Sequence, residues 1–487
     1  MARIAVIGAG LGALAGAARL ATAGHRVTVF ERGQTYGGGV RRYERDGFAF
    51  DTGPGVLWLP AVWRDLFLKT GREPLESRVA LRQVDPGARH LFADGTGVTL
   101  PAASRAGVLR ALDAALGEGS GRRWADLLVR ARTAWDATRR PLLEEPLTAG
   151  ERAEPAALAD PYPALRRRGL LRRRPPVLAE VAADELGDPR LVALLEHYAL
   201  GHGLDPRTAP ASASVLAYLE QTFGGWYVGG GVRALADAVH RRCAERGVEF
   251  VFGAEVVRTD VRDGRAAGVV LADGTRVAAD AVVDGTCPHP GPAPGRGRLT
   301  VALALRGARP ADAVHTTVVH APARDAELAA LFGRPDPAAG LTVTVRRPDD
   351  PDCVPDGGHE AVTLTATVPP DGEVAWAEPE VAQAYAGRLL AAAGRAVPEL
   401  RERLLWHAVH TPADAAAQTG VPGGAVPVPA LAGPGAGPRP VPNAGGTPGL
   451  YAAGGWAHPG GGLAHAGMSG ALVAGLVTEG PGWRGSR

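Results

Sequence analysis

The stretch from Met1 to Gly55 constrains the fold of this chain more than any other. Arg3–Gly10 (RIAVIGAG) is a short apolar run that ends in glycines, and Leu11–Ala23 is a run of small and apolar residues typical of a helix. His25–Glu31 (HRVTVFE) is a second apolar run, and it ends in an acid. This order predicts strand, tight turn, helix and strand, which is the opening of a parallel α/β unit.

The spacing within this unit is typical of a dinucleotide-binding turn. Gly8 and Gly10 allow a tight turn and a close approach to a pyrophosphate, while Ala13 is small enough to keep the helix against the strand. The helix N-terminus offers unpaired N–H groups and a positive dipole end. Glu31 ends the second strand, where a carboxylate can accept both ribose hydroxyls. The alternative is a glycine-rich turn in an ordinary α/β domain, but the order of strand, helix, strand and acid favours the nucleotide. The candidate residues are Gly8, Gly10, Leu11, Gly12, Ala13, Glu31 and Arg32.

Two further glycine-containing segments follow, Gly37–Gly39 and Asp51–Gly55 (DTGPG). With these residues the sequence resembles the flavin-dependent amine oxidase superfamily, and within it the bacterial-type phytoene (carotenoid) desaturases. The resemblance implies FAD, with the second glycine cluster beside the pyrophosphate and the DTGPG segment near the flavin ring. Alone, the glycine cluster would be interpreted as a flexible loop; its distance from Glu31 favours the cofactor. The resemblance adds Gly38, Gly39, Gly53, Pro54 and Gly55 to the candidate residues.

Length and composition set the outer limits. A chain of 487 residues, 46% hydrophobic and 21% charged, is globular and too long for one simple core. Its 53 basic and 51 acidic side chains leave a formal charge of +2, which gives no reason to expect nucleic acid as a partner.

Three cysteines, Cys243, Cys287 and Cys353, are far apart in the chain. Their spacing matches neither a disulfide framework nor a zinc site, so we expect a reducing, cytoplasmic location and no metal. The first apolar run is already a strand rather than a signal peptide, and no run of 18 apolar residues occurs that would span a membrane.

An arginine-rich stretch, Leu165–Pro176 (LRRRGLLRRRPP), has two interpretations. One is a peripheral contact with an anionic membrane surface. The second, which charge runs favour in general, is a solvated face or a loop.

The middle of the chain predicts a return to the nucleotide-binding region and then a second sheet. Gly203–Pro206 and Gly224–Gly231 match segments of the desaturase family, and the resemblance places the backbone at Val256 against the FAD adenine. Thr286–Arg298 departs from the family and is predicted to be a proline-rich linker. The antiparallel strands expected after it are Leu299–Arg306, Val314–His320, Leu341–Arg346, Glu360–Val368 and Leu404–His410.

The C-terminal stretch predicts a second strand, turn and helix unit. Gly449–Gly455 is followed by Trp456–Gly462 and then by a helix of small residues from about Leu463 to Val477. This segment matches a GxxxHPGxG pattern of the family, and its helix dipole would favour a negatively charged reduced flavin. The candidate flavin contacts here are Gly454, Gly455, Gly462, Leu463 and Ala464.

The fold class is therefore α/β, with a Rossmann-like FAD-binding domain and an interleaved α+β substrate domain that contains an antiparallel sheet and helices. The FAD-binding domain is expected to comprise residues 1–75, 224–285 and 441–487. The substrate domain is expected to comprise residues 76–223, its membrane-facing part, and 286–440.

We expect an FAD-dependent oxidoreductase that dehydrogenates a hydrophobic isoprenoid or carotenoid by hydride transfer to flavin N5. His458 and Glu220 are candidates for a base that takes the accompanying proton, against a structural histidine and an exposed glutamate as alternatives. The same residues are compatible with a desaturase, oxidase or isomerase of another secondary metabolite, and with a non-enzymatic prenyl-binding escort-like protein. The sequence leaves the oligomeric state and the final electron acceptor open.

Overall fold

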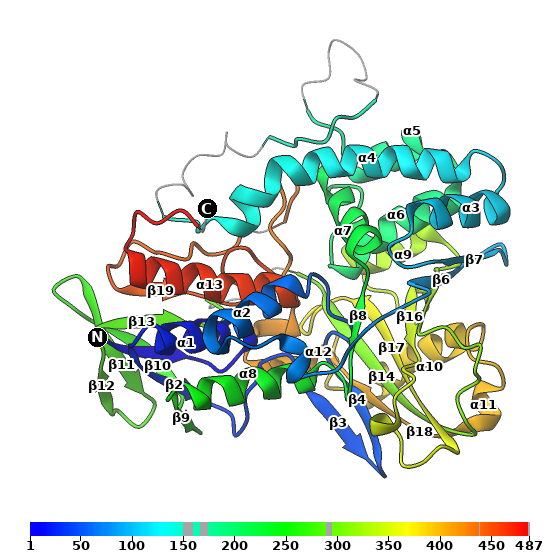
Figure 1. Cartoon of the computed structure of the whole chain (residues 1–487). Helices are drawn as coiled ribbons and strands as arrows, with labels where there is room; N and C mark the ends of the chain where they lie inside the picture. The colour runs from blue at the N-terminus through cyan, green and yellow to red at the C-terminus, as the bar shows by residue number, and fades with distance from the viewer. Residues whose placement is uncertain (150–158, 166–173, 289–294, 438, 486–487) are drawn as a thin grey trace.

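The computed structural model describes residues 1–149, 159–165, 174–288, 295–437 and 439–485, and these form two interleaved regions (Figure 1). The first region is built on a five-stranded parallel sheet with the order β19-β13-β1-β2-β9. Its strands are β1 (Arg3–Ile7), β2 (Arg26–Glu31), β9 (Glu249–Phe252), β13 (Ala281–Asp284) and β19 (Leu450–Ala452). These strands come from all three segments expected in the FAD-binding domain, whose exact boundaries stay a prediction.

Helices cover one face of this sheet and a small β-meander covers the other, because its strands are apolar on both faces, as buried parallel strands are. The central strand β1 is buried at four of its five residues. The helices of this region are α1 (Leu11–Thr22), α2 (Ala61–Gly71), α8 (Arg233–Glu245) and α13 (Leu463–Glu479). Figure 1 shows α13, α2 and α1 stacked on one side of the sheet, with α8 below them.

Glycines let α1 and α13 approach each other closely. A Cβ on Gly12 would lie 2.6 Å from the Cα of Gly454, which follows β19, and a Cβ on Gly470, on α13, would lie 2.4 Å from the carbonyl oxygen of Gly12. Real side chains do not tolerate such distances, so only glycine allows this packing. The first and last helices of the region are thereby held as one unit.

Three small sheets surround the nucleotide-binding region. A meander of β10 (Val256–Arg262), β11 (Arg265–Leu271) and β12 (Arg276–Ala278) follows β9. The strands β3 (Arg42–Arg45) and β4 (Phe48–Asp51) form a hairpin, and β5 (Leu81–Gln83) pairs with β8 (Trp226–Val228). The last pairing returns the chain from the helical layer to the nucleotide-binding region at residues 224–231.

The second region is built on a seven-stranded sheet with the order β18-β14-β17-β16-β15-β6-β7. Its bounds are β6 (Ala88–Leu91), β7 (Gly97–Leu100), β14 (Gly297–Arg306), β15 (Thr316–Val319), β16 (Val343–Arg346), β17 (His359–Val368) and β18 (Leu404–His410). The predicted strands after the linker are thereby found in one sheet. The expected linker was too long at its end, because β14 already begins at Gly297.

The two faces of this sheet differ in chemistry. Alternate residues of β14 and β17, such as Leu303 and Leu364, belong to an apolar core with α9 (Arg324–Phe332) and α10 (Pro379–Ala393). The opposite face carries Arg298 and Thr300 on β14, with Thr365 paired to Thr300 on β17. Successive side chains of a strand point to opposite faces, so Arg298, Thr300 and Thr365 make a polar region on this second face.

A helical layer lies above the sheet in the view of Figure 1. It contains α3 (Arg105–Leu116), α4 (Ser120–Arg139), α5 (Leu178–Glu185), α6 (Pro189–Gly201) and α7 (Val215–Phe223), which share one apolar core. Short helices lie at η1 (Leu75–Ser77), η2 (Arg140–Glu144), η5 (Ala211–Ser214), η6 (Pro351–Cys353), α11 (Leu400–Arg403), α12 (Pro412–Thr419) and η7 (Pro422–Gly424).

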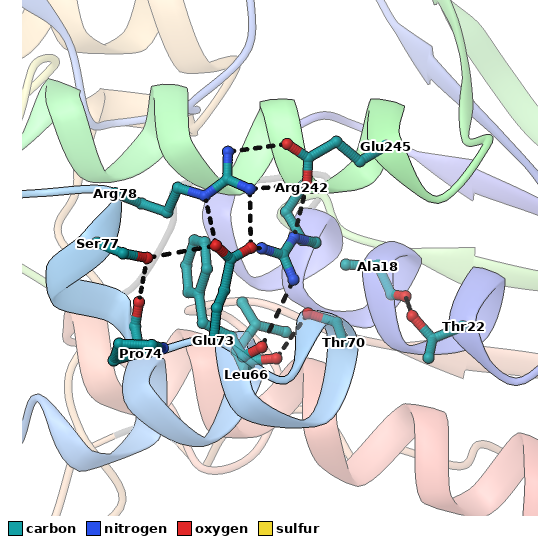
Figure 2. A network of polar contacts seen from close by, with 11 residues as sticks. Ala18, Thr22, Leu66, Thr70, Glu73, Pro74, Ser77, Arg78, Arg242 and Glu245 are labelled. Atoms are coloured by element: carbon teal, nitrogen blue, oxygen red, sulfur yellow. Dashed lines mark hydrogen bonds and ion pairs between the residues drawn. The ribbon is translucent and has the colours of Figure 1, made fainter.

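A charged network, the Arg242 clamp, joins α8 to the end of α2 (Figure 2). The Arg242 side chain has no exposed surface, and its guanidinium forms ion pairs with Glu73 and Glu245. Arg78 bridges the same two carboxylates at 2.8 and 2.9 Å. The arginine hydrogen bonds lower the pKa of Glu73 to about 2. Every charge of the clamp therefore has an opposite partner.

The arginine-rich stretch is only partly within the described residues. Arg166–Arg173 lie outside them, so the predicted membrane contact stays a prediction. The next residue, Arg174, forms a 2.7 Å ion pair with Glu180 at the start of α5. None of the helices in the described part of the chain is long and apolar enough to cross a membrane.

Candidate functional site

The site begins at the turn between β1 and α1. Gly8 has φ +83°, a conformation that side chains rarely adopt, and Gly10 caps the N-terminus of α1. A Cβ on Gly10 would meet no atom within 4 Å, so the space in front of the helix is open. Leu11, Gly12 and Ala13 form the first turn of α1 and are buried. An open helix N-terminus with free N–H groups is suited to a pyrophosphate.

Glu31 lies beside this turn at the end of β2. One carboxylate oxygen accepts the Ala9 N–H and the other accepts the Gly33 N–H, both at 2.8 Å. These bonds fix the carboxylate next to the open space at Gly10, and each oxygen retains a further lone pair for a hydroxyl. Arg32 points elsewhere: its guanidinium donates to the Ala417 carbonyl at 2.9 Å, on α12.

The second glycine cluster packs directly on the first. Gly38 has φ +59°, and a Cβ there would lie 3.1 Å from the Gly10 Cα. Gly39 is exposed. A Cβ on Gly53 would lie 2.3 Å from the carbonyl oxygen of Gly39, so these two glycines are in close contact. The three glycine segments of the first 55 residues therefore meet at one place. The family resemblance implied that all three lie near the cofactor, but not which glycines touch.

Arg41 is a residue of this site that the sequence analysis missed. Its Nε donates to the Gly38 carbonyl at 2.8 Å. Burial lowers the pKa of Arg41, and the negative charge of Glu31 opposes that shift. A cation next to the cluster would balance a bound phosphate. Its position as the first arginine after Gly37–Gly39 was the available signal.

We call the site formed by these glycine segments, the first turn of α1 and Glu31 the cradle. Pro54 and its neighbours run from the cradle to the seven-stranded sheet. Thr300 on β14 donates to the Thr52 carbonyl at 3.3 Å. A Cβ on Gly55 would lie 2.8 Å from the Cδ of Arg346, so the arginine stem packs on this glycine. A pocket of about 490 Å³, counting solvent at its mouth, adjoins Gly53, Gly55, Arg346 and Asp51.

The C-terminal unit completes the cradle. Gly454 packs on Gly12, and Gly455 packs on Pro427, because a Cβ there would lie 2.8 Å from the proline ring. Gly462 has φ +111° and caps the N-terminus of α13, ahead of Leu463 and Ala464. It is exposed although Gly461 before it is buried. A second helix N-terminus is thus accessible to a flavin.

Val256 begins β10 and packs on a small core that contains Ile7 and Phe30, at the ends of β1 and β2. Just before it, Ala254 donates its N–H to the Glu31 carbonyl at 2.9 Å. The segment therefore returns to the end of β2, and its contact with an adenine stays a prediction.

The two candidate bases differ in their surroundings. Burial raises the pKa of Glu220, on α7, to about 8, while the positive charge of Arg346 opposes the shift. A carboxyl with a strongly raised pKa in an enclosed site is suited to proton transfer. His458 is buried, and its Nε2 lies 3.0 Å from the Glu145 carbonyl oxygen. This bond gives His458 a structural partner at the turn before α13.

Further histidines, which the sequence analysis missed, lie near these residues. Burial lowers the pKa of His465, on α13, to about 4, and the charges of His202 and His458 add to the shift. His465 also lines an apolar pocket of about 420 Å³, counting its open solvent, between α4 and α7. No group of His, Cys, Asp or Glu in the described residues is arranged to bind a metal.

Comparisons with known proteins agree with this geometry. The model of the family "Flavin containing amine oxidoreductase" matches residues 14–478. The chain belongs to this family. The predicted family, fold class and flavin cofactor are thereby confirmed.

The chain is also similar to curated proteins over part of its length. A "4,4'-diapolycopene oxygenase" of Methylomonas sp is 33% identical over 286 residues, which are 58% of this chain and 55% of that protein. A "zeta-carotene-forming phytoene desaturase" of Myxococcus xanthus is 34% identical over 283 residues, 58% of this chain and 52% of that protein. The chain thus spans about half the length of the curated relatives it matches.

A solved structure covers the whole fold. An oxidoreductase from Methanosarcina mazei superposes with a TM-score of 0.63 at 18% identity, over 97% of this chain and 99% of that one. At this identity the likeness shows the fold alone.

Proposed function

We propose that this chain is an FAD-dependent oxidoreductase that desaturates a long, lipophilic isoprenoid or polyene. The observation that carries the proposal is the pair of open helix N-termini at Gly10 and Gly462, joined by glycine packing between α1 and α13. Membership of the flavin family and the names of the relatives support the substrate class.

The residues of the chain hold and orient the cofactor. The first turn of α1 would bind the pyrophosphate, with Arg41 balancing its charge, and Glu31 would accept the ribose hydroxyls. When bound, FAD supplies an acceptor for a hydride. The start of α13 would lie beside the flavin ring, where a positive dipole end favours electron uptake.

Glu220 is the favoured base. Its carboxyl is largely protonated at neutral pH, because burial raises its pKa to about 8. In its ionised form it takes a proton from the carbon next to the C–H bond that loses the hydride, which completes a carbon–carbon double bond. His458 is the second candidate, although its bond to the Glu145 carbonyl favours a role in positioning the turn.

The apolar pocket between α4 and α7 supports a lipophilic substrate. Its walls include Trp135, Leu216 and Leu219, and it reaches His465 in the first turn of α13. An apolar chain seated there would exclude water from the reacting bond.

Anaerobic mixing of the flavin-loaded protein with a panel of polyenes tests the proposal. We expect the flavin absorbance to bleach with a substrate and mass spectrometry to find a product lighter by two hydrogens. A product of unchanged mass would indicate an isomerase, and rapid reoxidation of the bleached flavin with release of H2O2 once air is admitted would indicate an oxidase. Binding of a prenyl chain by flavin-free protein, without bleaching, would favour the escort alternative. No response to any polyene would overturn the proposal.

A further inference from the structure

Two arginines on the polar face of the seven-stranded sheet differ from the paired arginines elsewhere. Arg298, on β14, donates to the Gly201 carbonyl at 3.2 Å, and Arg346, on β16, donates to the Thr365 hydroxyl at 3.2 Å. Neither guanidinium forms an ion pair with a carboxylate in the described part of the chain. Buried or half-buried charges are normally paired, so two unpaired cations require an explanation.

The strand register brings these two arginines together. Arg298 is opposite Thr367 on β17, and Arg346 is opposite Thr363 on the same strand. Thr365 lies between these two positions and accepts the Arg346 hydrogen bond. Both side chains therefore lie on one face, on either side of a single threonine. Each of the two arginines is half-buried.

Burial acts against both charges of the pair. It lowers the pKa of Arg298, and it lowers that of Arg346 to about 10, with the charge of Arg298 adding to the effect. The charges of Asp51 and Glu220 oppose the shift at Arg346. Burial raises the pKa of Asp51 to about 6 and that of Glu220 to about 8, and neither carboxylate forms an ion pair with the two arginines in the described part of the chain.

Arg346 lines the pocket of about 490 Å³, counting solvent at its mouth, that adjoins Gly53 and Gly55. Phe50 and Ala361 add apolar surface to the wall of this pocket. Arg298 lies on the same face of the sheet, on the other side of Thr365. We call this pocket, together with the two arginines, the chamber. The stem of Arg346 also packs on Gly55, in the segment beside the proposed flavin ring.

We propose that Arg298 and Arg346 bind a carboxylate at one end of a lipophilic substrate, so that this enzyme acts on an apolar acid rather than on a pure hydrocarbon. This inference rests on the proposed function and names its substrate class. Guanidinium groups match carboxylates in shape and charge, and a hydrocarbon would leave both cations desolvated without a partner. The other anion that the pair could serve is the reduced flavin, and the experiment separates the two.

Binding of three matched C15 probes to the flavin-loaded protein tests the inference, with tryptophan fluorescence as readout. The probes are farnesoic acid, farnesol and farnesene. We expect the acid to bind at least tenfold more tightly than the alcohol or the hydrocarbon. Arg346→Met and Arg298→Met should remove this preference, because each should lower the affinity for the acid and leave the affinities for the alcohol and the hydrocarbon unchanged. Arg388→Met, a surface change on α10, is the matched control and should keep it.

Three outcomes overturn the inference: equal affinity of the wild type for all three probes, a preference for the acid that survives both substitutions, or variants that change only the flavin reduction potential. Flavin content shows that each variant is folded. Thr365→Val removes the hydroxyl that accepts the Arg346 hydrogen bond without removing a charge, and it should cause a partial loss of the preference for the acid.

If the acid preference holds while no polyene or polyene acid bleaches the flavin, the proposed function fails and the binding site stands. If polyene hydrocarbons are desaturated and no probe preference exists, only this inference fails.

Discussion

The Arg242 clamp and the Arg298–Arg346 pair are two arginine-centred groups that differ in one respect. In the clamp, two guanidinium groups meet two carboxylates, and the network joins α8 to the end of α2 (Figure 2). In the pair, two guanidinium groups meet only a threonine hydroxyl and a backbone carbonyl. The comparison teaches that a paired buried charge serves the fold, whereas an unpaired one marks a place for a ligand.

Changes near the cradle and chamber should therefore alter cofactor binding and chemistry, whereas changes at the clamp should alter stability.

Gly10→Val should abolish flavin binding. The backbone of Gly10 is at φ −70° and a Cβ meets no atom within 4 Å, so the fold accepts valine while its methyls fill the pyrophosphate space. We expect flavin content after purification to fall more than tenfold. Gly387→Val, at a helical glycine with equally open surroundings, is the control and should keep its flavin. Full flavin content in the Gly10 variant would show that the site is misassigned.

Glu220→Gln should slow flavin reduction about 100-fold or more, the usual contribution of a general base. Only the ionised carboxyl takes a proton, so kcat/KM should rise with pH and level off above about 8, the raised pKa of Glu220. Stopped-flow measurement of flavin bleaching across pH checks both points. The variant should lose the pH dependence as well as the rate. A variant with the wild-type profile would remove Glu220 from the mechanism.

Arg242→Met should lower the free energy of unfolding by about 2 kcal/mol, because it removes charge-assisted hydrogen bonds from a fully buried side chain. Flavin content and the preference among the C15 probes should not change. Thermal unfolding of the flavin-loaded protein measures the loss. An altered probe preference at unchanged Tm would contradict the division between the two arginine groups.

The histidines His90, His197 and His320 should make the fold sensitive to acid. Their rings pack together, and burial lowers the pKa of each, that of His197 to about 4. The unfolded chain takes up protons near pH 6.5 and the folded chain does not, so stability should fall as pH drops from 6.5 towards 4. For one histidine, the free energy of unfolding should fall by about 1.4 kcal/mol per pH unit within this range.

Denaturant unfolding at a series of pH values measures this slope. His197→Phe keeps the ring contacts and should reduce the slope by the share of one histidine. An unchanged slope in that variant would place the acid sensitivity elsewhere.

Much of the fold and of the cradle could be predicted from the sequence, because the signals are local. The turn at Gly8 and Gly10, the acid at Glu31 and the strand Leu404–His410 each follow from a few consecutive residues, and β18 has the predicted bounds. The glycine contact between α1 and α13 could not be predicted, since Gly12 and Gly454 meet only in the folded chain.

The chamber escaped the sequence analysis for the same reason. Arg298 and Arg346 are far apart in the chain, and neither belongs to a motif; only the register of β14, β17 and β16 brings them together. Glu220 was selected without any sign of its raised pKa, which depends on burial by surrounding elements. The bond of His458 to the Glu145 carbonyl likewise joins distant segments.

The glycine contact between α1 and α13 also sets the order of events during synthesis. The N-terminal half of the cradle leaves the ribosome early, but α13 and β19 are translated more than 400 residues later. At about 5–20 residues per second, the nascent chain waits roughly 20 to 90 s for its partner helix. During that time the apolar face of α1 that α13 will cover lacks its partner helix. The proposed flavin site can therefore form in full only after α13 has been synthesised.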